Sequence, residues 1–574
     1  MNTHDTKKGF MLASVLVISF AIIAVMTSLL VVASNAYKDS GVNYYQKLAD
    51  EAAEAGASYA TACLNLSDHA QTWGPAISRN DLVPSSDCSG ATNYPDNTYV
   101  YSDATVRSYF AVGDLDYTTP FSAQISARGY TEVMSKSGSI SKTYTSIQKK
   151  VLTWPTDTVG QMSASGTNRT CAIVSYSVYC WGWNGYGQLG NGMYVGPPSN
   201  IEAASAVDST VPVKVSQEPG VMAGKRIVKI FVAQYHSCAL SQDGLMYCWG
   251  NNNAGQLGTG NATDSAVPVQ VKGALLGKTI TDIGGTSNTT CAVAGGKFYC
   301  WGQNNLGQVG INSTTFSIPN PTLVVASNTA STLPTSYSAT ALSSSGSRSQ
   351  TMCGIANGKA YCWGQNDFGA VGDGTPGGTR LVPTKVDDTG VLSGKTVTSL
   401  SQDGYVSTGS GGFAHVCAIA NSRVYCWGDN QSGQLGNGAS GTNNYSASPV
   451  ETTWTGVLSG KVAEDIQVGL RHSCVKASGG VYCWGMNTSG QLGEGSGTNK
   501  STPVAVQTAP GALSATNVTT IGAGANRGCA TITDGRTFCW GLNSNGQIGD
   551  GTKITRSIPT ESLFLRPSGN AYIF

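Results

Sequence analysis

The segment CAVAGGKFYCWGQNNLGQVG, residues 291–310, contains a pattern that recurs along most of this chain. Two cysteines flank a Gly-Gly dipeptide, and the second cysteine begins a Cys-Trp-Gly tripeptide that is followed by a Gly-Gln-Val-Gly tetrad. The tripeptide occurs seven times, with tryptophans at Trp181, Trp249, Trp301, Trp363, Trp427, Trp484 and Trp540. The matching tetrads start at Gly187, Gly255, Gly307, Gly369, Gly433, Gly490 and Gly546. Seven units over residues 155–567 average about 59 residues each, which suits one four-stranded blade of a β-propeller per unit.

The cysteine spacing predicts the local geometry of each unit. A two-residue turn at Gly295 and Gly296 would place Cys291 opposite Cys300, at a separation that a disulfide can bridge. Four more pairs share this spacing: Cys171 with Cys180, Cys353 with Cys362, Cys417 with Cys426, and Cys474 with Cys483. Two pairs have one more residue between them: Cys238 with Cys248, and Cys529 with Cys539. We predict one disulfide in each unit. Zinc is the alternative, but a structural zinc site needs four ligands together, and each cysteine pair lies alone in its unit.

The repeated Trp-Gly-x-Asn-x-x-Gly-Gln-Leu-Gly run, with strands such as residues 236–240 before it, resembles the repeats of the regulator of chromosome condensation family. This resemblance implies a closed ring of seven blades. Residues 556–560 match the strand that precedes other units, so we expect them to pair with the first blade and close the ring. The nucleotide-exchange members of that family act on a nuclear GTPase, but the cysteines and the N-terminal segment argue against that activity here.

The first 62 residues differ from the repeats in composition. Lys7, Lys8 and Gly9 precede an uncharged, mostly apolar stretch over residues 10–36, which is long enough to cross a bilayer as a helix. The two lysines favour a cytoplasmic N-terminus. Helix-forming residues continue beyond the stretch, and we therefore expect one long helix over residues 10–62. A secretory signal peptide is the alternative interpretation.

The Lys-Lys-Gly-Phe start before a long apolar helix resembles the N-terminus of type IV prepilins. The resemblance implies a leader over residues 1–9, cleavage by a prepilin peptidase between Gly9 and Phe10, and N-methylation of Phe10. The helix would hold the chain in the inner membrane before assembly and then pack against other pilin subunits. Most pilins carry a glutamate at the fifth mature position, which here is Ser14. A missing carboxylate disfavours ordinary insertion into the shaft and favours a minor pilin at the tip.

Residues 63–154 contain alternating strand-like runs, and we expect a small pilin-like sheet there, with a disulfide between Cys63 and Cys88. The predicted fold is therefore mainly β: a long N-terminal α-helix with a small α+β head, then a disulfide-stapled seven-bladed β-propeller over residues 155–567 and a tail over residues 568–574.

Composition restricts the function. Charged residues make up 12% of the chain and the net charge is +1, so a nucleic-acid partner is not favoured. The chain has 16 cysteines, and those of the repeats are regularly paired, which indicates an oxidising compartment outside the cytoplasm. His236, His415 and His472 each stand two residues before a repeat cysteine, and we interpret them as structural. We find no nucleophile, acid–base pair, metal site or cofactor motif, and we expect no enzymatic activity.

We therefore predict an extracellular minor type IV pilin, at the pilus tip, whose propeller binds a surface receptor or protein ligand. Two alternatives stay open: an initiating or capping subunit of a pilus or type II secretion pseudopilus, and an anchored propeller that binds proteins as an inhibitor does. The segments that interrupt the repeat are rich in small polar residues and are the expected recognition loops; they cover residues 193–209, 311–348, 402–414 and 439–448.

Overall fold

The architecture comes from a computed structural model of the chain. It describes residues 41–66, 101–102, 105–112, 116–119, 122–135, 137, 139–153, 162–163, 168–174, 176–193, 207–216, 220–326, 332–343, 348–407, 411–507, 517–533 and 535–563. These residues fall into two compact units, which meet in the sequence between residues 155 and 156. The predicted membrane span over residues 10–36 lies outside the described residues. No helix among the described residues is long and apolar enough to cross a membrane.

The described residues of the first unit form a helix packed on an antiparallel sheet. Helix α2 spans Gly41–Leu66 and therefore ends four residues later than predicted. The strands are β1 (Tyr101–Ser102), β2 (Val106–Val112), β3 (Asp116–Thr119), β4 (Ser122–Met134) and β5 (Ile140–Thr153). Strand β4 is central and pairs with β2, β3 and β5.

The helix lies close to this sheet because two glycines remove side chains from the contact. A Cβ on Gly129 of β4 would lie 1.9 Å from the Ala49 carbonyl oxygen, and a Cβ on Gly56 of α2 would lie 2.9 Å from the Phe110 ring. The buried alanines of α2 leave room for the same close approach; they are Ala49, Ala52, Ala53, Ala57 and Ala60.

The second unit contains seven four-stranded antiparallel sheets, each built from consecutive strands. Blade 1 has β6 (Met162–Ser163), β7 (Arg169–Val174), β8 (Ser177–Gly182) and β9 (Ser209–Lys214). Blade 2 has β10 (Ile227–Val232), β11 (His236–Ser241), β12 (Met246–Gly250) and β13 (Ser265–Gln270). Blade 3 has β14 (Ile280–Gly285), β15 (Thr289–Ala294), β16 (Lys297–Gln303) and β17 (Ser317–Leu323). Blade 4 has β18 (Ala339–Leu342), β19 (Thr351–Ala356), β20 (Lys359–Gln365) and β21 (Thr379–Lys385).

Blade 5 has β22 (Val397–Ser407), β23 (Gly411–Ala420), β24 (Arg423–Asp429) and β25 (Tyr445–Glu451). Blade 6 has β26 (Ala463–Val468), β27 (His472–Ala477), β28 (Gly480–Gly485) and β29 (Lys500–Ala505). Blade 7 has β30 (Val518–Gly524), β31 (Arg527–Ile532), β32 (Thr537–Gly541) and β33 (Arg556–Glu561). Short 3-10 helices, η2 (Gly273–Leu275) and η3 (Gly456–Leu458), lie in two of the links between blades.

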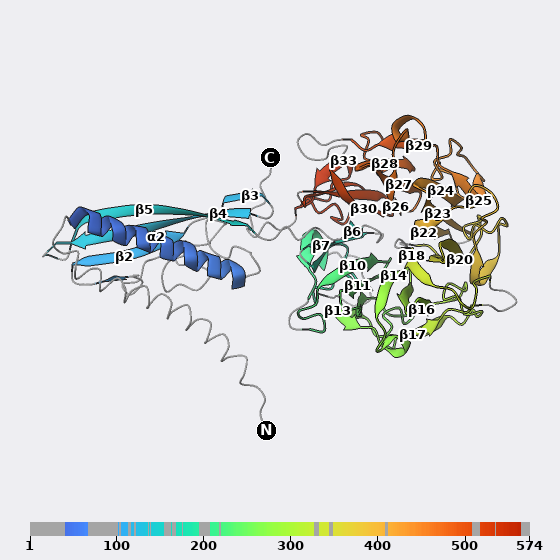
Figure 1. Cartoon of the computed structure of the whole chain (residues 1–574), viewed down its shortest axis with the longest axis horizontal. Helices are drawn as coiled ribbons and strands as arrows, with labels where there is room; N and C mark the ends of the chain where they lie inside the picture. Colours follow the sequence, from blue (N-terminus) through green and yellow to red (C-terminus); the bar gives the residue numbers. More distant parts are fainter. Residues whose placement is uncertain are drawn as a thin grey trace, which may run out of the picture. The chain divides into compact units, whose positions relative to one another are not determined.

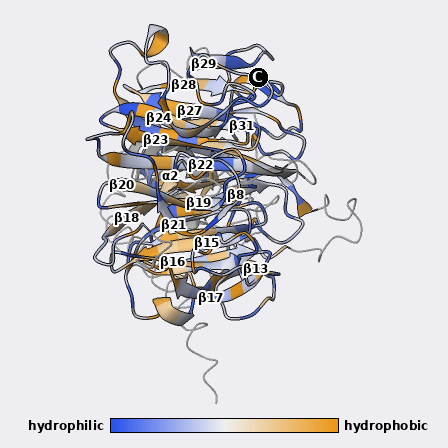
Figure 2. Ribbon diagram, turned by 90° about the vertical axis from the view of Figure 1, so that its right-hand side faces the viewer, coloured by the Kyte–Doolittle hydropathy of each residue, from blue (hydrophilic) through white to orange (hydrophobic). Residues whose placement is uncertain are grey.

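The seven sheets form a ring, with the first strand of each blade toward the centre (Figure 1). Colouring by hydropathy shows that hydrophobic residues follow the strands, whereas many of the connecting loops are hydrophilic (Figure 2). The core therefore consists of the contacts between neighbouring blades.

The turns between the second and third strands follow the predicted chemistry. Gly295 and Gly296 have φ angles of 57° and 67°, and Asn357 and Gly358 have φ angles of 52° and 71°. Positive φ at both central residues characterises the type I′ turn, whose twist matches that of the two strands. The turn thus sets the register in which Cys291 pairs with Cys300.

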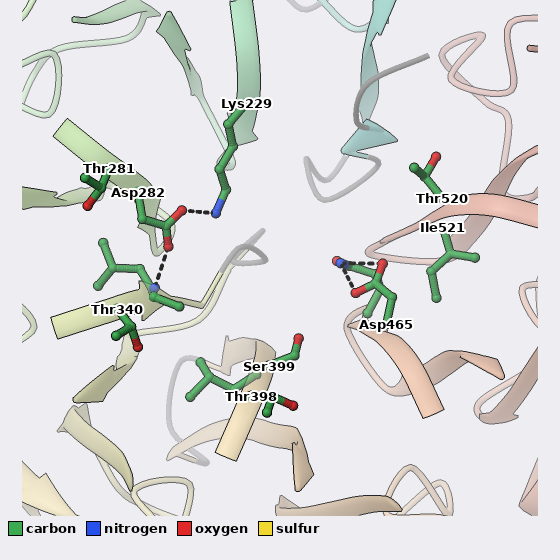
Figure 3. A pocket seen from close by; sticks show the side chains of 13 residues that line it. Lys229, Thr281, Asp282, Thr340, Thr398, Ser399, Asp465, Thr520 and Ile521 are labelled. Carbon is green, nitrogen blue, oxygen red and sulfur yellow. Dashed lines mark hydrogen bonds and ion pairs between the residues drawn. The ribbon is translucent and has the colours of Figure 1, made fainter. Parts of the chain in front are cut away.

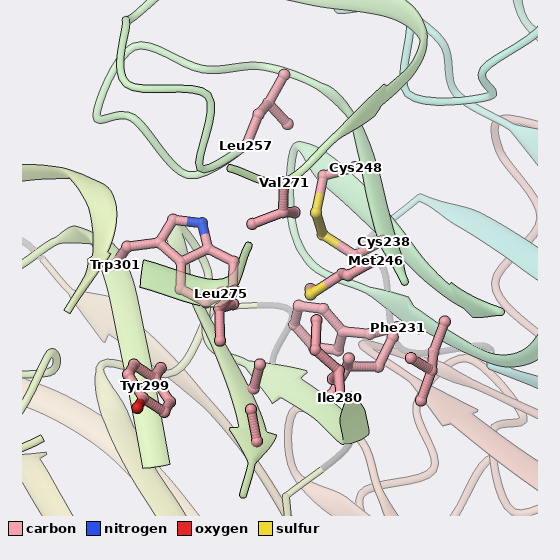
Figure 4. Packing of buried hydrophobic residues seen from close by; sticks show 14 of the residues in the cluster. Phe231, Cys238, Met246, Cys248, Leu257, Val271, Leu275, Ile280, Tyr299 and Trp301 are labelled. Atoms are coloured by element: carbon pink, nitrogen blue, oxygen red, sulfur yellow. A yellow bond between two sulfur atoms is a disulfide. The ribbon is translucent and has the colours of Figure 1, made fainter. Parts of the chain in front are cut away.

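Figure 4 shows how one interface between blades is filled. Phe231, Met246 and the Cys238–Cys248 disulfide of blade 2 pack toward Ile280 and Trp301 of blade 3. The other buried members of this cluster include Leu257, Val271, Leu275 and Tyr299. Each blade therefore completes its hydrophobic core with side chains of its neighbour.

Three expectations about the repeat were wrong in detail. Residues 556–560 do not pair with the first blade, because β33 pairs with β32 and completes blade 7. The segment over residues 311–348 contains β17 and β18, so it is in part regular structure. The segment over residues 402–414 is largely an extension of the β22–β23 hairpin. Backbone pairing in the sheets explains all three differences, since a polar sequence can still supply a full hydrogen-bonded strand.

Candidate functional site

The ring is held together by one contact that is repeated between all neighbouring blades. Each repeat tryptophan is buried and donates its indole Nε1–H to a tetrad carbonyl of the preceding blade. Trp249 bonds to Gln188 O at 2.9 Å, and Trp301 bonds to Gln256 O at 3.0 Å. Trp181 of blade 1 bonds to Gln547 O of blade 7 at 3.0 Å, so the same contact closes the ring. The Gly551 amide of blade 7 also donates to Thr210 O of blade 1 at 3.1 Å. Closure therefore uses contacts between two separate blades and not a strand shared between the ends.

The tetrad itself is shaped by the side chains around it. Asn252 accepts a hydrogen bond from the Leu257 amide at 2.9 Å, and Gln256 accepts one from the Ala254 amide at 2.9 Å. The last glycine of this tetrad, Gly258, has a φ of 67°, and a Cβ there would lie 2.7 Å from Trp301 Nε1. The tetrads are thus packing turns, and the last glycine of this tetrad is required by both backbone conformation and space.

The three repeat histidines are fully buried and join neighbouring blades. The Nε2 atom of His236 lies 2.8 Å from Thr290 Oγ1 of the next blade, and that of His415 lies 2.9 Å from Ser473 Oγ. The Nε2 atom of His472 lies 3.2 Å from Arg527 O. Burial lowers the pKa of His236 and His415 to about 3 and that of His472 to about 4, so all three are neutral near pH 7.

Two arginines occupy the same repeat position as these histidines. Arg169 donates to Gln234 O at 2.8 Å and also to His236 O of blade 2. Arg527 donates to Thr170 Oγ1 at 3.0 Å and also to Arg169 O, across the junction of blades 7 and 1. The three histidines and two arginines thus link neighbouring blades. Threonine occupies the same position in blades 3 and 4, where Thr289 donates to Gln303 O and Thr351 donates to Gln365 O of the same blade.

The fourteen repeat cysteines form seven disulfides, one in each blade, and their Cα atoms are 4.0–4.1 Å apart. The pairing that the spacing predicts is confirmed throughout. The bonds join Cys171 to Cys180, Cys238 to Cys248, Cys291 to Cys300, Cys353 to Cys362, Cys417 to Cys426, Cys474 to Cys483, and Cys529 to Cys539. Each bond links the second and third strands of its blade at directly opposed positions, as Cys171 and Cys180 show.

The other predicted site residues have no structural account. Gly9, Phe10, Ser14 and Cys88 lie outside the described residues, so the Cys63–Cys88 disulfide stays a prediction. In the described part of the chain, no group of three or more His, Cys, Asp and Glu side chains is arranged to hold a metal ion.

The centre of the ring contains a polar cavity of about 300 Å³ lined by the first strands of blades 2 to 7. Lys229 of β10 and Asp282 of β14 form an ion pair across two blades, and Asp282 also accepts a hydrogen bond from the Leu342 amide at 2.7 Å (Figure 3). Asp465 lies on the opposite side, where Gln467 donates to it at 3.3 Å (Figure 3). Desolvation by the cavity wall raises the pKa of Asp465.

Sequence reasoning missed these cavity residues. Lys229, Asp282 and Asp465 occupy equivalent register positions, each following the bulge in the first strand of its blade. Aligning the repeats on the cysteines would have put them at one position, and that alignment is the signal that could have found them.

One end of the ring carries half-exposed aromatic clusters. Trp183, Tyr186 and Tyr235 form one cluster, with ring centroids 5.4–5.9 Å apart across blades 1 and 2. A second cluster contains Phe368, Phe413 and the exposed Tyr445. Both lie at the end of the ring where loops follow the third strands and precede the second strands, with Phe413 in β23 and Tyr445 at the start of β25. We call this end the loop face.

These features define the second unit as a disulfide-stapled seven-bladed β-propeller with a polar central cavity. The Regulator of chromosome condensation (RCC1) repeat matches residues 177–240, 243–293, 357–402, 421–475, 478–530 and 534–568, more than half of the chain. The chain therefore belongs to the RCC1 repeat family. The longest unmatched interval within this region, residues 294–356, includes the interrupted repeat over residues 311–348.

The relatives differ widely in how much they share with this chain. The Ultraviolet-B receptor UVR8 of Arabidopsis thaliana is 28% identical over 403 residues, covering 69% of this chain and 80% of the receptor. The E3 ubiquitin-protein ligase HERC2 of Homo sapiens is 27% identical over 320 residues, which are 55% of this chain but only 6% of the ligase.

Solved structures show the same fold. Human WBSCR16 superposes with a TM-score of 0.54 and 18% identity, over 67% of this chain and 94% of WBSCR16. Prp20p of Saccharomyces cerevisiae, studied for its binding to Gsp1p and histones, superposes with a TM-score of 0.52 and 19% identity, over 70% of this chain and 87% of Prp20p.

Proposed function

We propose that this chain is a minor type IV pilin, located at the pilus tip, whose extracellular propeller recognises a surface receptor or a protein ligand. One observation carries the proposal: a helix packed on an antiparallel sheet precedes a ring stapled by seven disulfides. The helix-and-sheet unit fits a pilin head behind the Lys-Lys-Gly-Phe start, and disulfides persist outside the cytoplasm. The family matches all lie within residues 177–568, so the pilin part rests on the N-terminal sequence and this unit.

In this proposal the N-terminal helix contacts other pilin subunits, after a prepilin peptidase has cleaved the chain at the inner membrane. The propeller acts by binding and has no catalytic activity. The buried histidines support this role, because each one is used to join blades. The Trp183 cluster supports the loop face as the recognition surface, since aromatic side chains offer large contact areas at a low entropy cost.

Immunogold electron microscopy with an antibody against residues 155–567 tests the location. Gold at single filament ends is the expected result, with cells lacking the gene as the control for antibody specificity. Gold confined to the cell envelope would contradict the tip location and favour the pseudopilus or the anchored inhibitor-like propeller. Loss of all filaments on deletion would favour an initiating subunit.

Attachment of whole cells tests the recognition surface. Cells with Trp183→Ala and Tyr235→Ala are expected to attach at least tenfold less, because the cluster loses two of its three aromatic contact surfaces. Phe316→Ala is the matched control, since it removes a 57% exposed aromatic ring outside the cluster. Equal attachment by both strains, at equal amounts of surface propeller, would rule out the cluster as the receptor site.

A further inference from the structure

The end of the propeller opposite the loop face has its own repeated architecture. The hairpin turns between second and third strands lie there, and the links between blades return to them. The Ile280 amide donates to Gly244 O at 3.0 Å, and the Val397 amide donates to Gly358 O at 2.9 Å. We call this end, formed by the hairpin turns and the links, the hairpin face.

Four of the links share a short motif of the form Gly-x-x-x-Gly-Lys. They are residues 220–225, 273–278, 390–395 and 456–461. One apolar residue of each motif is buried in the ring, as Leu275 and Leu458 are. Another apolar residue of the same motif is left exposed: Val221 (49%), Leu276 (62%), Val391 (38%) and Val457 (41%). The hairpin face therefore repeats a short link that contains an exposed aliphatic side chain and a lysine.

Cations on this face are positioned by aromatic rings. The six pairs are Arg226–Tyr176, Lys297–Tyr337, Lys395–Tyr425, Lys461–Tyr482, Arg423–Trp454 and Arg536–Phe538, with the cation 3.6–5.8 Å from the ring centroid. A cation–π contact holds the charge in place without neutralising it. The first four cations have no carboxylate partner among the described residues.

Other cations on both faces have carboxylate partners. On the hairpin face, Lys225 contacts Asp243 at 2.7 Å and Arg423 contacts Glu451 at 3.3 Å. The described part of the loop face has three such pairs. Arg380 contacts Asp373 at 2.6 Å, and Arg556 contacts Asp550 at 2.7 Å. Arg471 lies 3.9 Å from Asp429. Although the whole chain has a net charge of only +1, the hairpin face carries four ring-held cations without a carboxylate partner among the described residues: Arg226, Lys297, Lys395 and Lys461.

We propose that the hairpin face is a docking surface for an acidic protein segment that also carries apolar side chains. Carboxylates would meet the ring-held cations, and the apolar side chains would cover the exposed aliphatic residues of the links. A nucleic acid or a sulfated polysaccharide offers anions but leaves those aliphatic residues uncovered, so a protein partner fits better. The inference rests on the proposed function only in taking the propeller to be a binding module, and it does not depend on the pilus.

Binding of synthetic polymers to the full-length chain in detergent tests the proposal. Poly(Glu,Tyr), a random copolymer, is expected to bind more tightly than poly-Glu, and raising the salt concentration should weaken both. Duplex DNA and heparin are the other probes. Tighter binding of DNA or heparin than of poly(Glu,Tyr) would contradict a protein partner. If neither poly-Glu nor poly(Glu,Tyr) bound, the hairpin face would be refuted as a docking surface.

Charge variants locate the surface. The fourfold variant Arg226→Gln, Lys297→Gln, Lys395→Gln and Lys461→Gln should bind poly(Glu,Tyr) at least tenfold more weakly. Lys500→Gln with Lys553→Gln is the matched control, because both lysines belong to the loop-face end of their blades, and its affinity should be unchanged. Equal affinity losses in the two variants would refute the proposal.

A second variant keeps the proposal testable if the fourfold variant unfolds. Leu276→Ser with Val457→Ser changes only exposed side chains, so the fold should be retained. It should weaken binding of poly(Glu,Tyr) at least threefold and leave binding of poly-Glu unchanged; an unchanged affinity for both would contradict the apolar part of the surface. Gold at the envelope instead of the pilus tip would alter none of these affinities, so the two proposals fail separately.

Discussion

Replacing Gly258 or Gly277 by alanine distinguishes two energetic costs. One is the cost of a left-handed backbone conformation for an L residue, and the other is the cost of disturbing a contact between blades. Gly258 and Gly277 have φ angles of 67° and 74°. Alanine at either position costs about 1–2 kcal/mol because an L residue disfavours this conformation. A Cβ on Gly277 meets nothing within 4 Å, whereas a Cβ on Gly258 would lie 2.7 Å from Trp301 Nε1.

Gly258→Ala should therefore lose more stability than Gly277→Ala. The new Cβ displaces the indole and breaks its 3.0 Å bond to Gln256 O. A buried polar group without a partner costs about 1–3 kcal/mol, and overpacking costs about 1–3 kcal/mol. We expect Gly258→Ala to lower the free energy of unfolding by about 2–5 kcal/mol more than Gly277→Ala, within the sum of these two costs.

Guanidinium unfolding with the disulfides intact, followed by tryptophan fluorescence, measures both variants. Trp301→Phe provides the coupling control: once the indole N–H is gone, adding Gly258→Ala should cost less than it does in the wild-type chain. Equal losses for Gly258→Ala and Gly277→Ala would refute the idea that the tetrad–tryptophan contact holds neighbouring blades together.

Three further predictions concern stability. Replacing Cys353 and Cys362 by alanine together should lower the free energy of unfolding by about 2–3 kcal/mol, since a ten-residue loop is no longer closed in the unfolded chain; a change below about 0.5 kcal/mol would contradict this. The pKa of His236 is about 3 in the folded chain, so between pH 6.5 and 3 only the unfolded chain takes up this proton. The free energy of unfolding should therefore fall by up to about 1.4 kcal/mol per pH unit as the pH drops from 6.5 toward 3. His236→Gln should make the measured dependence of this free energy on pH less steep. In the central cavity, Lys229→Met should lower the free energy of unfolding by about 1–3 kcal/mol, because Asp282 loses its cation. A double-mutant cycle with Asp282→Asn should show coupling between the two residues. If the two effects simply added, the pair would contribute nothing to stability.

The parts of the structure that were predicted correctly depend on neighbours in the sequence. Cys291 and Cys300 belong to one hairpin, and the Gly-Gly turn between them determines their register. The repeat of that hairpin with a following tetrad predicted seven blades. The segment after the last tetrad was assigned to the wrong blade, because a Ser-Ile-Pro strand can pair with either edge and only the folded sheet shows that β33 lies beside β32.

The order of residues within one repeat is thus enough to specify the blade, with its turn, its disulfide and its tryptophan. The contacts between blades are established by the folded ring alone. In the folded ring, Trp181 donates to Gln547 O and Lys229 pairs with Asp282. The four ring-held cations without a carboxylate partner among the described residues lie at the hairpin face. The first of these contacts joins residues 366 positions apart, and the second joins residues 53 positions apart. Because such contacts follow from the closure of seven blades into one ring, and no local pattern encodes that closure, they cannot be read from a single repeat.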